Sequence, residues 1–123
     1  MKIVISNSGE KPIYEQIVDQ VKGMILSGSI EQGEPMPSIR FLAKELRISV
    51  ITTKRAYEEL ENEGFITTVP GKGSFVSSTN TELLKEEHYR KIEDYFQKAV
   101  DASRSIGMGK EELIEVLKML FDN

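Results

Sequence analysis

The chain has no cysteine and only one histidine in its 123 residues. Without cysteine it has neither a disulfide framework nor a thiolate metal site. The single imidazole, that of His88, has no thiol or carboxylate at ligand spacing around it, and a histidine in an apolar helical stripe is most often a partly buried packing residue. We therefore expect no bound metal and no cofactor.

Long apolar runs are also missing. Near the start only Ile3-Val4-Ile5 is continuously apolar, which is far shorter than the apolar region of a secretory signal. No later stretch approaches the length of a membrane span. These absences predict a cytoplasmic protein with no membrane partner.

No catalytic constellation stands out. Acidic residues fall on the solvent faces of the predicted helices, and serine and threonine have no neighbouring base. The segment Val69-Pro70-Gly71-Lys72-Gly73-Ser74 differs from a phosphate-binding loop, because glycine follows its lysine and predicted strands flank it. We expect no enzymatic activity.

Charge is unevenly distributed along the chain. The formal net charge is −4, yet residues 38–57 have a balance of +4 and residues 79–123 have seven basic against ten acidic side chains. A solvated mixed-charge surface would explain either cluster alone but not their segregation. Because contact with phosphate groups requires positive charge at the contact face, the pattern favours DNA binding through residues 38–57. The charged residues of that segment are Arg40, Lys44, Glu45, Arg47, Lys54 and Arg55.

Helical periodicity predicts a first helix that has Pro12 as its first residue and ends at Ser27-Gly28. The segment from 27 to 37 is rich in glycine and proline and is predicted to be a loop with Ile30 and Met36 turned inward. Residues 1–10 are compatible with a short strand or a loose arm. The apolar stripe of the first helix consists of Ile13, Ile17, Val21 and Met24 or Ile25.

Two further helices and a hairpin follow. Ser38 and Ser49 are predicted to cap the helices, and the connection between them is only three or four residues, so the helices must cross steeply as in a helix-turn-helix. Gly64 ends the third helix, and residues 65–69 and 74–76 are predicted strands of a wing. The fold class is thus mainly α with a small β-hairpin. The core-facing residues are Ile39, Leu42, Ala43 and Leu46 in the second helix and Thr53, Ala56, Tyr57 and Leu60 in the third.

The same region resembles the winged-helix DNA-binding domain of the GntR family of bacterial transcription regulators. The resemblance covers about the first 78 residues and begins at Ile13-Tyr14-Glu15-Gln16-Ile17. The remaining residues are too few for a large ligand-binding domain, which favours the short YtrA-like subgroup and implies transporter genes as targets. The motifs are Pro37-Ser38-x-Arg40-x-Leu42-Ala43-x-x-Leu46, Thr52-x-x-Arg55-Ala56-x-x-x-Leu60-x-x-Glu63-Gly64-x-Ile66 and Gly71-Lys72-Gly73-x-Phe75-Val76.

This resemblance implies that residues 1–78 are a DNA-binding domain whose third helix enters the major groove. Arg40 stands at a helix start, which favours an anion, although an arginine there can instead pair with Glu45 in solvent. Val50 replaces the arginine that is common in the family, and Val50 and Ile51 are suited to contact thymine methyl groups. The expected DNA-binding residues are Ser38, Arg40, Ser49, Val50, Ile51, Thr52, Lys54, Arg55, Gly71, Lys72 and Gly73.

One position in the turn departs from the family pattern. Arg47 stands where a glycine is usual. A positive φ angle there costs a residue with a side chain on the order of 1 kcal/mol. Either the turn differs slightly or the strain is tolerated.

Residues 79–123 form a predicted helical hairpin. Thr79 and Glu82 make a possible capping pair, and apolar residues recur at helical spacing until Ile106, before Gly107-Met108-Gly109 interrupts them. The apolar stripes exceed what a hairpin buries internally, so a second copy of the chain is the simplest partner. The expected dimerisation residues are Leu84, Ile92, Phe96, Leu113, Leu117 and Leu120.

The sequence thus predicts a homodimeric regulator, a repressor, that binds a pseudo-palindromic operator in double-stranded DNA. The alternative is a winged helix that serves as a protein-interaction module without a DNA role. The sequence does not identify a small-molecule effector.

Overall fold

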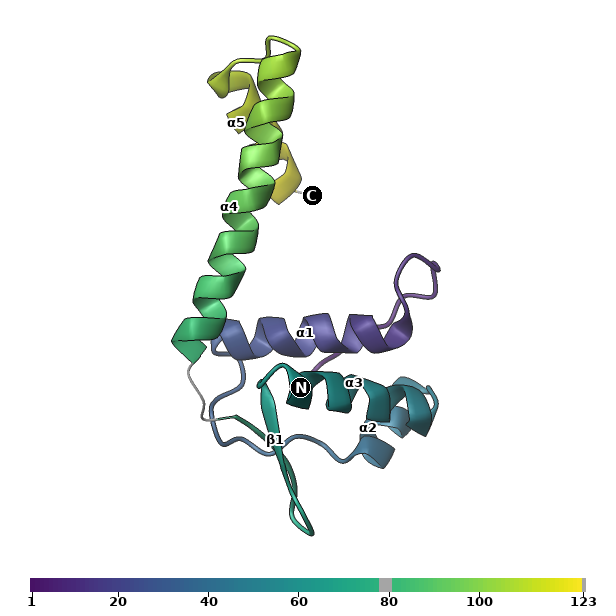
Figure 1. Cartoon of the computed structure of the whole chain (residues 1–123). Coiled ribbons are helices and arrows are strands. Elements are labelled where there is room, and N and C mark those ends of the chain that lie inside the picture. Colours follow the sequence, from purple (N-terminus) through teal and green to yellow (C-terminus); the bar gives the residue numbers. More distant parts are fainter. Residues whose placement is uncertain (78–80, 123) are drawn as a thin grey trace. The chain divides into compact units, whose positions relative to one another are not determined.

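The computed structural model describes residues 1–77 and 81–122, and it divides into two compact units, Met1–Thr81 and Glu82–Asn123. Figure 1 shows the ribbon of both units. The expected boundary between residues 78 and 79 and the capping residue Thr79 lie outside the described residues.

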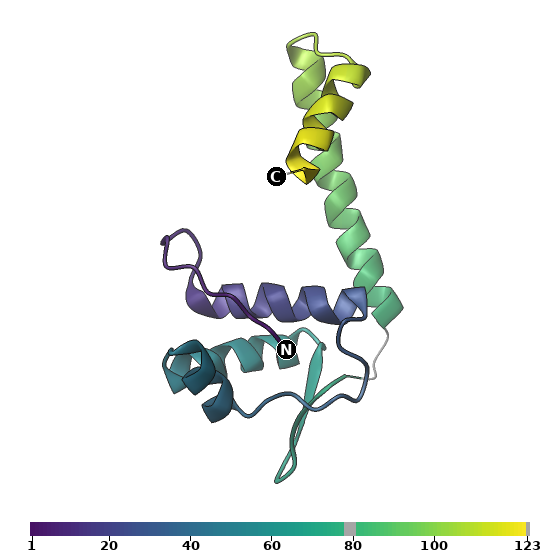
Figure 2. The same ribbon diagram turned by 180° about the vertical axis from the view of Figure 1, so that it is seen from behind.

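The first helix, α1 (Ile13–Ser27), runs along the upper edge of the first unit in both side views (Figures 1 and 2). Pro12 is the N-cap of this helix and not, as predicted, its first residue, because its ψ of 147° is extended. Its carbonyl already accepts a hydrogen bond from the Gln16 N–H. At the other end Gly28, with a φ of 82°, closes the helix as expected. The buried residues of α1 are Ile17, Val18, Val21 and Ile25.

Residues 1–6 form an extended arm along α1 and not a strand. Two glutamine side chains of α1 hold its main chain. Gln20 accepts from the Val4 N–H at 2.9 Å and donates to the Val4 carbonyl at 2.7 Å, and Gln16 makes the same pair of bonds with Ser6. Within the arm, Ile3 is buried. The arm is therefore attached through its backbone, as a strand is attached to its neighbour.

The helices α2 (Ile39–Leu46) and α3 (Val50–Asn62) form the predicted helix-turn-helix. The Ser38 and Ser49 hydroxyls accept hydrogen bonds from the N–H groups of Phe41 and Thr52, so both predicted caps are confirmed. Arg47 adopts a φ of 56° and is the one residue other than glycine with a positive φ in the described part of the chain. The strain at Arg47 is tolerated because the turn closes α2 with a bond from the Ile48 N–H to the Ala43 carbonyl.

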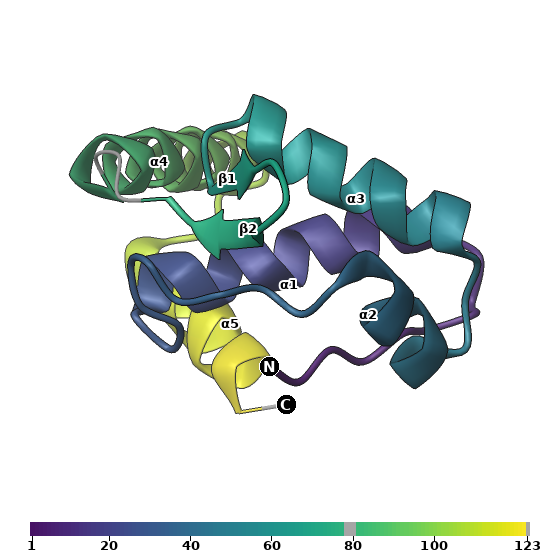
Figure 3. The same ribbon diagram turned by 90° about the horizontal axis from the view of Figure 1, so that it is seen from below.

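The wing consists of β1 (Ile66–Val69) and β2 (Gly73–Val76), paired antiparallel with Ile66 opposite Val76. β1 begins one residue later than predicted, and β2 begins one residue earlier than predicted. Seen from below, the hairpin lies beside the C-terminal part of α3 and α2 lies beside its N-terminal part (Figure 3). Ile66 and Val76 are buried, so the base of the hairpin belongs to the core.

The loop before α2 does more than link two helices. Ile30 and Met36 are buried as predicted. In addition, the Gly33 and Met36 N–H groups donate to the carbonyls of Val76 and Ser74, both at 2.8 Å, and Pro35 forms a bridge with Phe75. Residues 33–36 thus pair with the outer side of β2.

The second unit is a hairpin of α4 (Thr81–Ser105) and α5 (Lys110–Phe121). Gly107 turns the chain with a φ of 73°, and the Met108 N–H donates to the Ser103 carbonyl at 2.8 Å. Ile106, expected on the apolar stripe, is 75% exposed because α4 ends one residue before it. Across the described ranges no helix has the length and apolar character needed to cross a membrane.

Candidate nucleic-acid interface

The N-terminal turn of α3 presents apolar side chains to solvent. Val50 is 47% exposed and Ile51 is 82% exposed, whereas Thr53, three residues from Val50, is fully buried. Thr53 also donates its hydroxyl to the Ser49 carbonyl, which fixes the first turn against the core. A helix that exposes a large aliphatic residue at its start offers a surface for thymine methyl groups.

Thr52 is more restrained than the sequence suggests. Its Oγ1 accepts a hydrogen bond from the Ser49 hydroxyl at 2.8 Å, while its own N–H donates to Ser49 Oγ at 3.0 Å. Ser49 is therefore a cap that orients Thr52. The Thr52 hydroxyl can still donate its proton to an acceptor such as a phosphate or base oxygen.

Arg40 is exposed in the first turn of α2. The pairing with Glu45 that the sequence left open is not found: the ion pairs between described residues do not include Arg40. Ser38, beside it, uses its side chain as the helix cap. The guanidinium therefore lies in solvent at the positive end of a helix, where an anion is favoured.

Tyr57 fixes the angle between α2 and α3. Its buried hydroxyl donates to the Pro37 carbonyl at 2.6 Å, directly before the start of α2. Burial raises the pKa of the Tyr57 hydroxyl, so the group stays protonated and continues to donate. Arg40 and Ile51 are thus carried by helices whose relative position is set by a buried hydrogen bond.

Two cations lie further along α3. Lys54 is only loosely paired, with its Nζ 3.9 Å from Glu58 Oε1 and both side chains more than half exposed. Arg55 instead stacks on the Tyr14 ring of α1, with 3.9 Å between the guanidinium carbon and the ring centroid. Sequence reasoning missed this contact because the two residues lie far apart in the chain.

The tip of the wing carries Lys72, which is exposed between Gly71 and Gly73. Both glycines have positive φ angles, 77° and 105°, which residues with side chains rarely adopt. The Lys72 N–H donates to the Val69 carbonyl at 2.9 Å and closes the turn. Both side views show the hairpin extending away from α1 past α3 (Figures 1 and 2).

The wing is also joined to α3 by side chains. The Thr68 hydroxyl lies 2.8 Å from a carboxylate oxygen of Glu61 and 2.9 Å from the hydroxyl of Ser74. These contacts hold β1 beside α3. The predicted interface residues thus belong to one unit, on three elements that are tied to one another.

Comparison with known proteins agrees with this arrangement. The family model described as "Bacterial regulatory proteins, gntR family" matches residues 13–76. The HTH-type transcriptional repressor YtrA of Bacillus subtilis is 34% identical over 116 residues, which cover 94% of this chain and 89% of that protein. The predicted resemblance to YtrA-like regulators is therefore confirmed.

Solved structures share the fold. A GntR family transcriptional regulator from Listeria monocytogenes is 30% identical and superposes with a TM-score of 0.74 over 94% of this chain and 98% of that chain. AraR(DBD) in complex with operator ORX1 is 22% identical and has the same fold, with a TM-score of 0.56 over 63% of this chain and 96% of that chain. The chain therefore belongs to the GntR family of bacterial transcription regulators, and its first unit is the DNA-binding winged helix of that family.

Proposed function

We propose that the protein is a homodimeric repressor that reads a pseudo-palindromic operator with the start of α3 and contacts DNA phosphates with its wing. The observation that carries this proposal is the 82% exposure of Ile51 at the capped, N-terminal turn of α3. An aliphatic side chain in that position is unfavourable in water and suited to the major groove. Repression is supported by the name of the similar YtrA protein.

The choice of bases follows from the residues at this turn. A bidentate arginine that reads guanine contributes about 1–3 kcal/mol of discrimination per base pair, and Val50 lacks that ability. Val50 and Ile51 favour thymine methyl groups instead. Arg40 of α2 and Lys54 of α3 come before and after this turn in the sequence, and they supply contacts to phosphate groups or bases. The operator of this protein therefore differs from those of relatives with arginine at position 50.

The second unit supports the dimer. No apolar side chain of its described residues is fully buried, and a groove of about 320 Å³ runs between α4 and α5. Ile92, Phe96 and Leu120 are each about half exposed or more. A second copy of the same hairpin is the partner we propose, since it offers an equal apolar surface and gives the two-fold symmetry that a palindromic operator requires. The groove residues are Phe96, Ala99, Lys110, Leu113, Ile114, Val116, Leu117 and Leu120.

A footprint on the DNA upstream of the protein's own gene tests the proposal. We expect two protected half-sites about one helical turn apart and an affinity that falls steeply with salt. Binding that is absent at low salt would favour the alternative of a protein-interaction module. Control of transporter genes, which the family resemblance implies, stays a prediction.

A further inference from the structure

Arg47 lies in the three-residue turn that joins α2 to α3. With a φ of 56° and a ψ of 46° it adopts the left-handed conformation, which is strained for a residue with a side chain. Its N–H donates to the Lys44 carbonyl at 3.2 Å, and the Ile48 N–H donates to the Ala43 carbonyl at 3.0 Å. The main chain of the turn is therefore fixed, and the Arg47 side chain starts from a defined place.

The turn does not require an arginine. The bonds that close it are made by main-chain groups, which any residue supplies. Glycine, and less often asparagine, adopts the left-handed conformation with less strain. Strained residues of this kind are found mainly at functional sites, where the strain is offset by what the residue does. The conformation of Arg47 therefore directs attention to its side chain.

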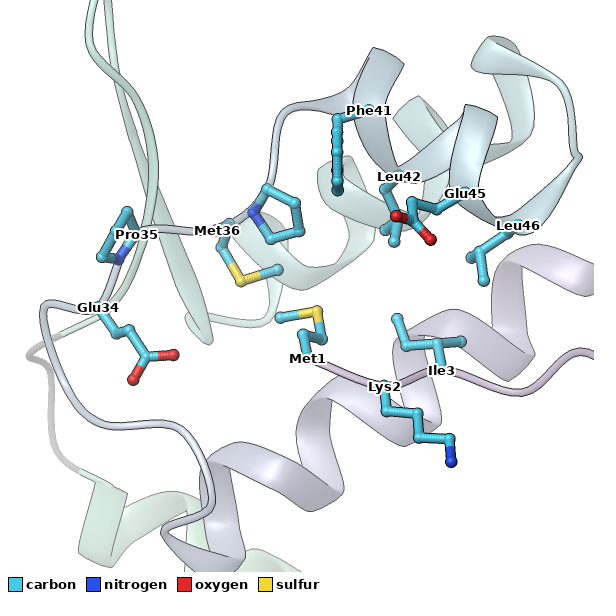
Figure 4. Close-up of a pocket in the computed structure, with 11 residues that line it drawn as sticks. Met1, Lys2, Ile3, Glu34, Pro35, Met36, Phe41, Leu42, Glu45 and Leu46 are labelled. Carbon is cyan, nitrogen blue, oxygen red and sulfur yellow. The ribbon is translucent and has the colours of Figure 1, made fainter.

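The guanidinium of Arg47 is exposed to solvent. Ion pairs and side-chain hydrogen bonds within residues 1–77 and 81–122 do not include it. Glu45, the acid nearest in the sequence, instead lines a cavity of about 580 Å³ beside the N-terminal arm, and its carboxylate lies over that space (Figure 4). Arg47 does not line this cavity. Its positive charge is thus left for a partner outside the chain.

The start of α3 is close to Arg47. The Cα atoms of Arg47 and Val50 are at most about 11 Å apart, because three residues span no more than about 3.6 Å each. The major groove of DNA is about 12 Å wide and is bordered by phosphates on both sides. A cation within one groove width of Val50 is therefore placed beside phosphates and away from the base edges.

We propose that Arg47 binds a DNA phosphate beside the bases that α3 reads, a role that rests on the proposed entry of α3 into the major groove. The planar guanidinium suits a bidentate contact with phosphate oxygens, and this contact offsets the strain of the turn. The alternative role is structural: a cation at the C-terminal end of α2 stabilises the helix dipole. That alternative predicts lower stability without Arg47 and unchanged contacts with DNA.

Arg47→Gly separates the two roles, because it removes the guanidinium and the strain together. The urea denaturation midpoint should not fall. The affinity for DNA should fall about ten-fold at low salt, the effect of one charge-assisted contact. The slope of log affinity against log salt should become shallower by about 0.9. Fluorescence anisotropy between roughly 50 and 200 mM salt measures both quantities, with one labelled duplex of random sequence and one from upstream of the protein's own gene.

Three further variants complete the comparison. Arg47→Asn also suits the left-handed conformation and should behave like Arg47→Gly. Arg47→Lys keeps the charge, so it should keep the slope and lose part of the affinity, since an ammonium group makes no bidentate contact. Arg90→Ala removes an exposed arginine of α4 and is the matched control, which should keep the slope of the unaltered chain.

The outcomes distinguish this role of Arg47 from the proposed function. If the unaltered chain binds DNA and Arg47→Gly binds with the same affinity and slope, this role alone is wrong. A lower urea midpoint with an unchanged slope would assign Arg47 to the end of α2 and overturn the phosphate contact. If the unaltered chain binds neither duplex, the proposed function fails, and the role of Arg47 fails with it.

Discussion

The guanidinium carbon of Arg55 lies 3.9 Å from the centroid of the Tyr14 ring, so a cation of α3 is stacked on an aromatic residue of α1. The contact joins two helices that are also packed through their apolar faces. It restricts a long side chain that would otherwise sample many rotamers, which lowers the entropy lost when its guanidinium binds a phosphate group. We therefore propose that Tyr14 contributes to DNA affinity, although it lies on α1.

Replacing Tyr14 with leucine should weaken operator binding and lower the free energy of unfolding by about 0.5–1 kcal/mol, the usual contribution of an exposed cation–π contact. Fluorescence anisotropy with operator DNA and urea denaturation measure the two effects. Tyr14→Phe is the control, because it keeps the ring and should behave like the unaltered chain. Equal losses in both variants would show that the ring is not what positions Arg55.

Arg40→Ala should weaken specific operator binding by about 1–3 kcal/mol if the arginine reads a base. The side chain is exposed and outside the core stripe, so the melting temperature and the oligomeric state should not change. Lys44→Ala removes a positive charge from the far end of the same helix and should weaken binding less. A destabilised Arg40→Ala variant that binds DNA normally would contradict the role of this residue.

Lys72→Ala should weaken binding to operator and random DNA alike, because a lysine at the tip of the wing neutralises phosphate charge and does not read bases. The slope of log affinity against log salt should become shallower by about 0.9, the value for one phosphate contact. A salt titration with both DNA sequences measures this. An unchanged slope would remove the wing contact from the proposal.

Removing the second unit should separate the two DNA-binding domains. A chain that ends near Ser78 should stay folded, become monomeric and lose most of its operator affinity, because the second domain no longer binds at a raised effective concentration. Sedimentation velocity gives the oligomeric state. A dimeric truncated chain, or a monomeric full chain at micromolar concentration, would contradict this role of the second unit.

A single substitution tests the same interface in the full chain. Leu117→Glu places a charge in the groove of the second unit and should dissociate the dimer. Met119→Glu is the matched control, since Met119 is 67% exposed on the same helix and does not line the groove. Dissociation by both variants alike would point away from the groove as the contact surface.

Tyr57→Phe should lower the free energy of unfolding by about 1–3 kcal/mol, because the Pro37 carbonyl loses its donor. The folded-state pKa of Tyr57 is raised, so above pH of about 10 the unfolded chain releases a proton that the folded chain keeps. Stability therefore falls as the pH rises through that range. Urea denaturation between pH 8 and 11 should show that Tyr57→Phe loses less stability with pH than the unaltered chain.

Local sequence determined the parts of the fold that were predicted correctly. The caps Ser38 and Ser49 act within three residues of themselves, and the buried set around Thr53 and Leu60 follows from helical spacing. Pro12 and the ends of the wing strands were each misplaced by one residue, since the exact end of an element depends on competing hydrogen bonds. Ile51 is exposed, as expected for a residue outside the predicted core-facing stripe of the third helix.

Contacts between distant segments were beyond sequence reasoning. The pairs Tyr14–Arg55 and Gln20–Val4 join residues at least 16 positions apart, and no local pattern marks them. Glutamine in a helix is ordinarily a solvent-facing residue. Helical periodicity therefore does not predict that Gln16 and Gln20 bind the main chain of the arm. The cavity beside the arm was missed for the same reason, because it exists only once the arm, the loop and α2 are brought together.

The pairing of residues 33–36 with β2 limits how the chain can vary in length. The Gly33, Met36 and Val76 amides all donate across this pairing, and a residue inserted between Gly33 and Met36 would shift its register. The loop therefore resists a change of length next to α2, where its main chain is bound to β2.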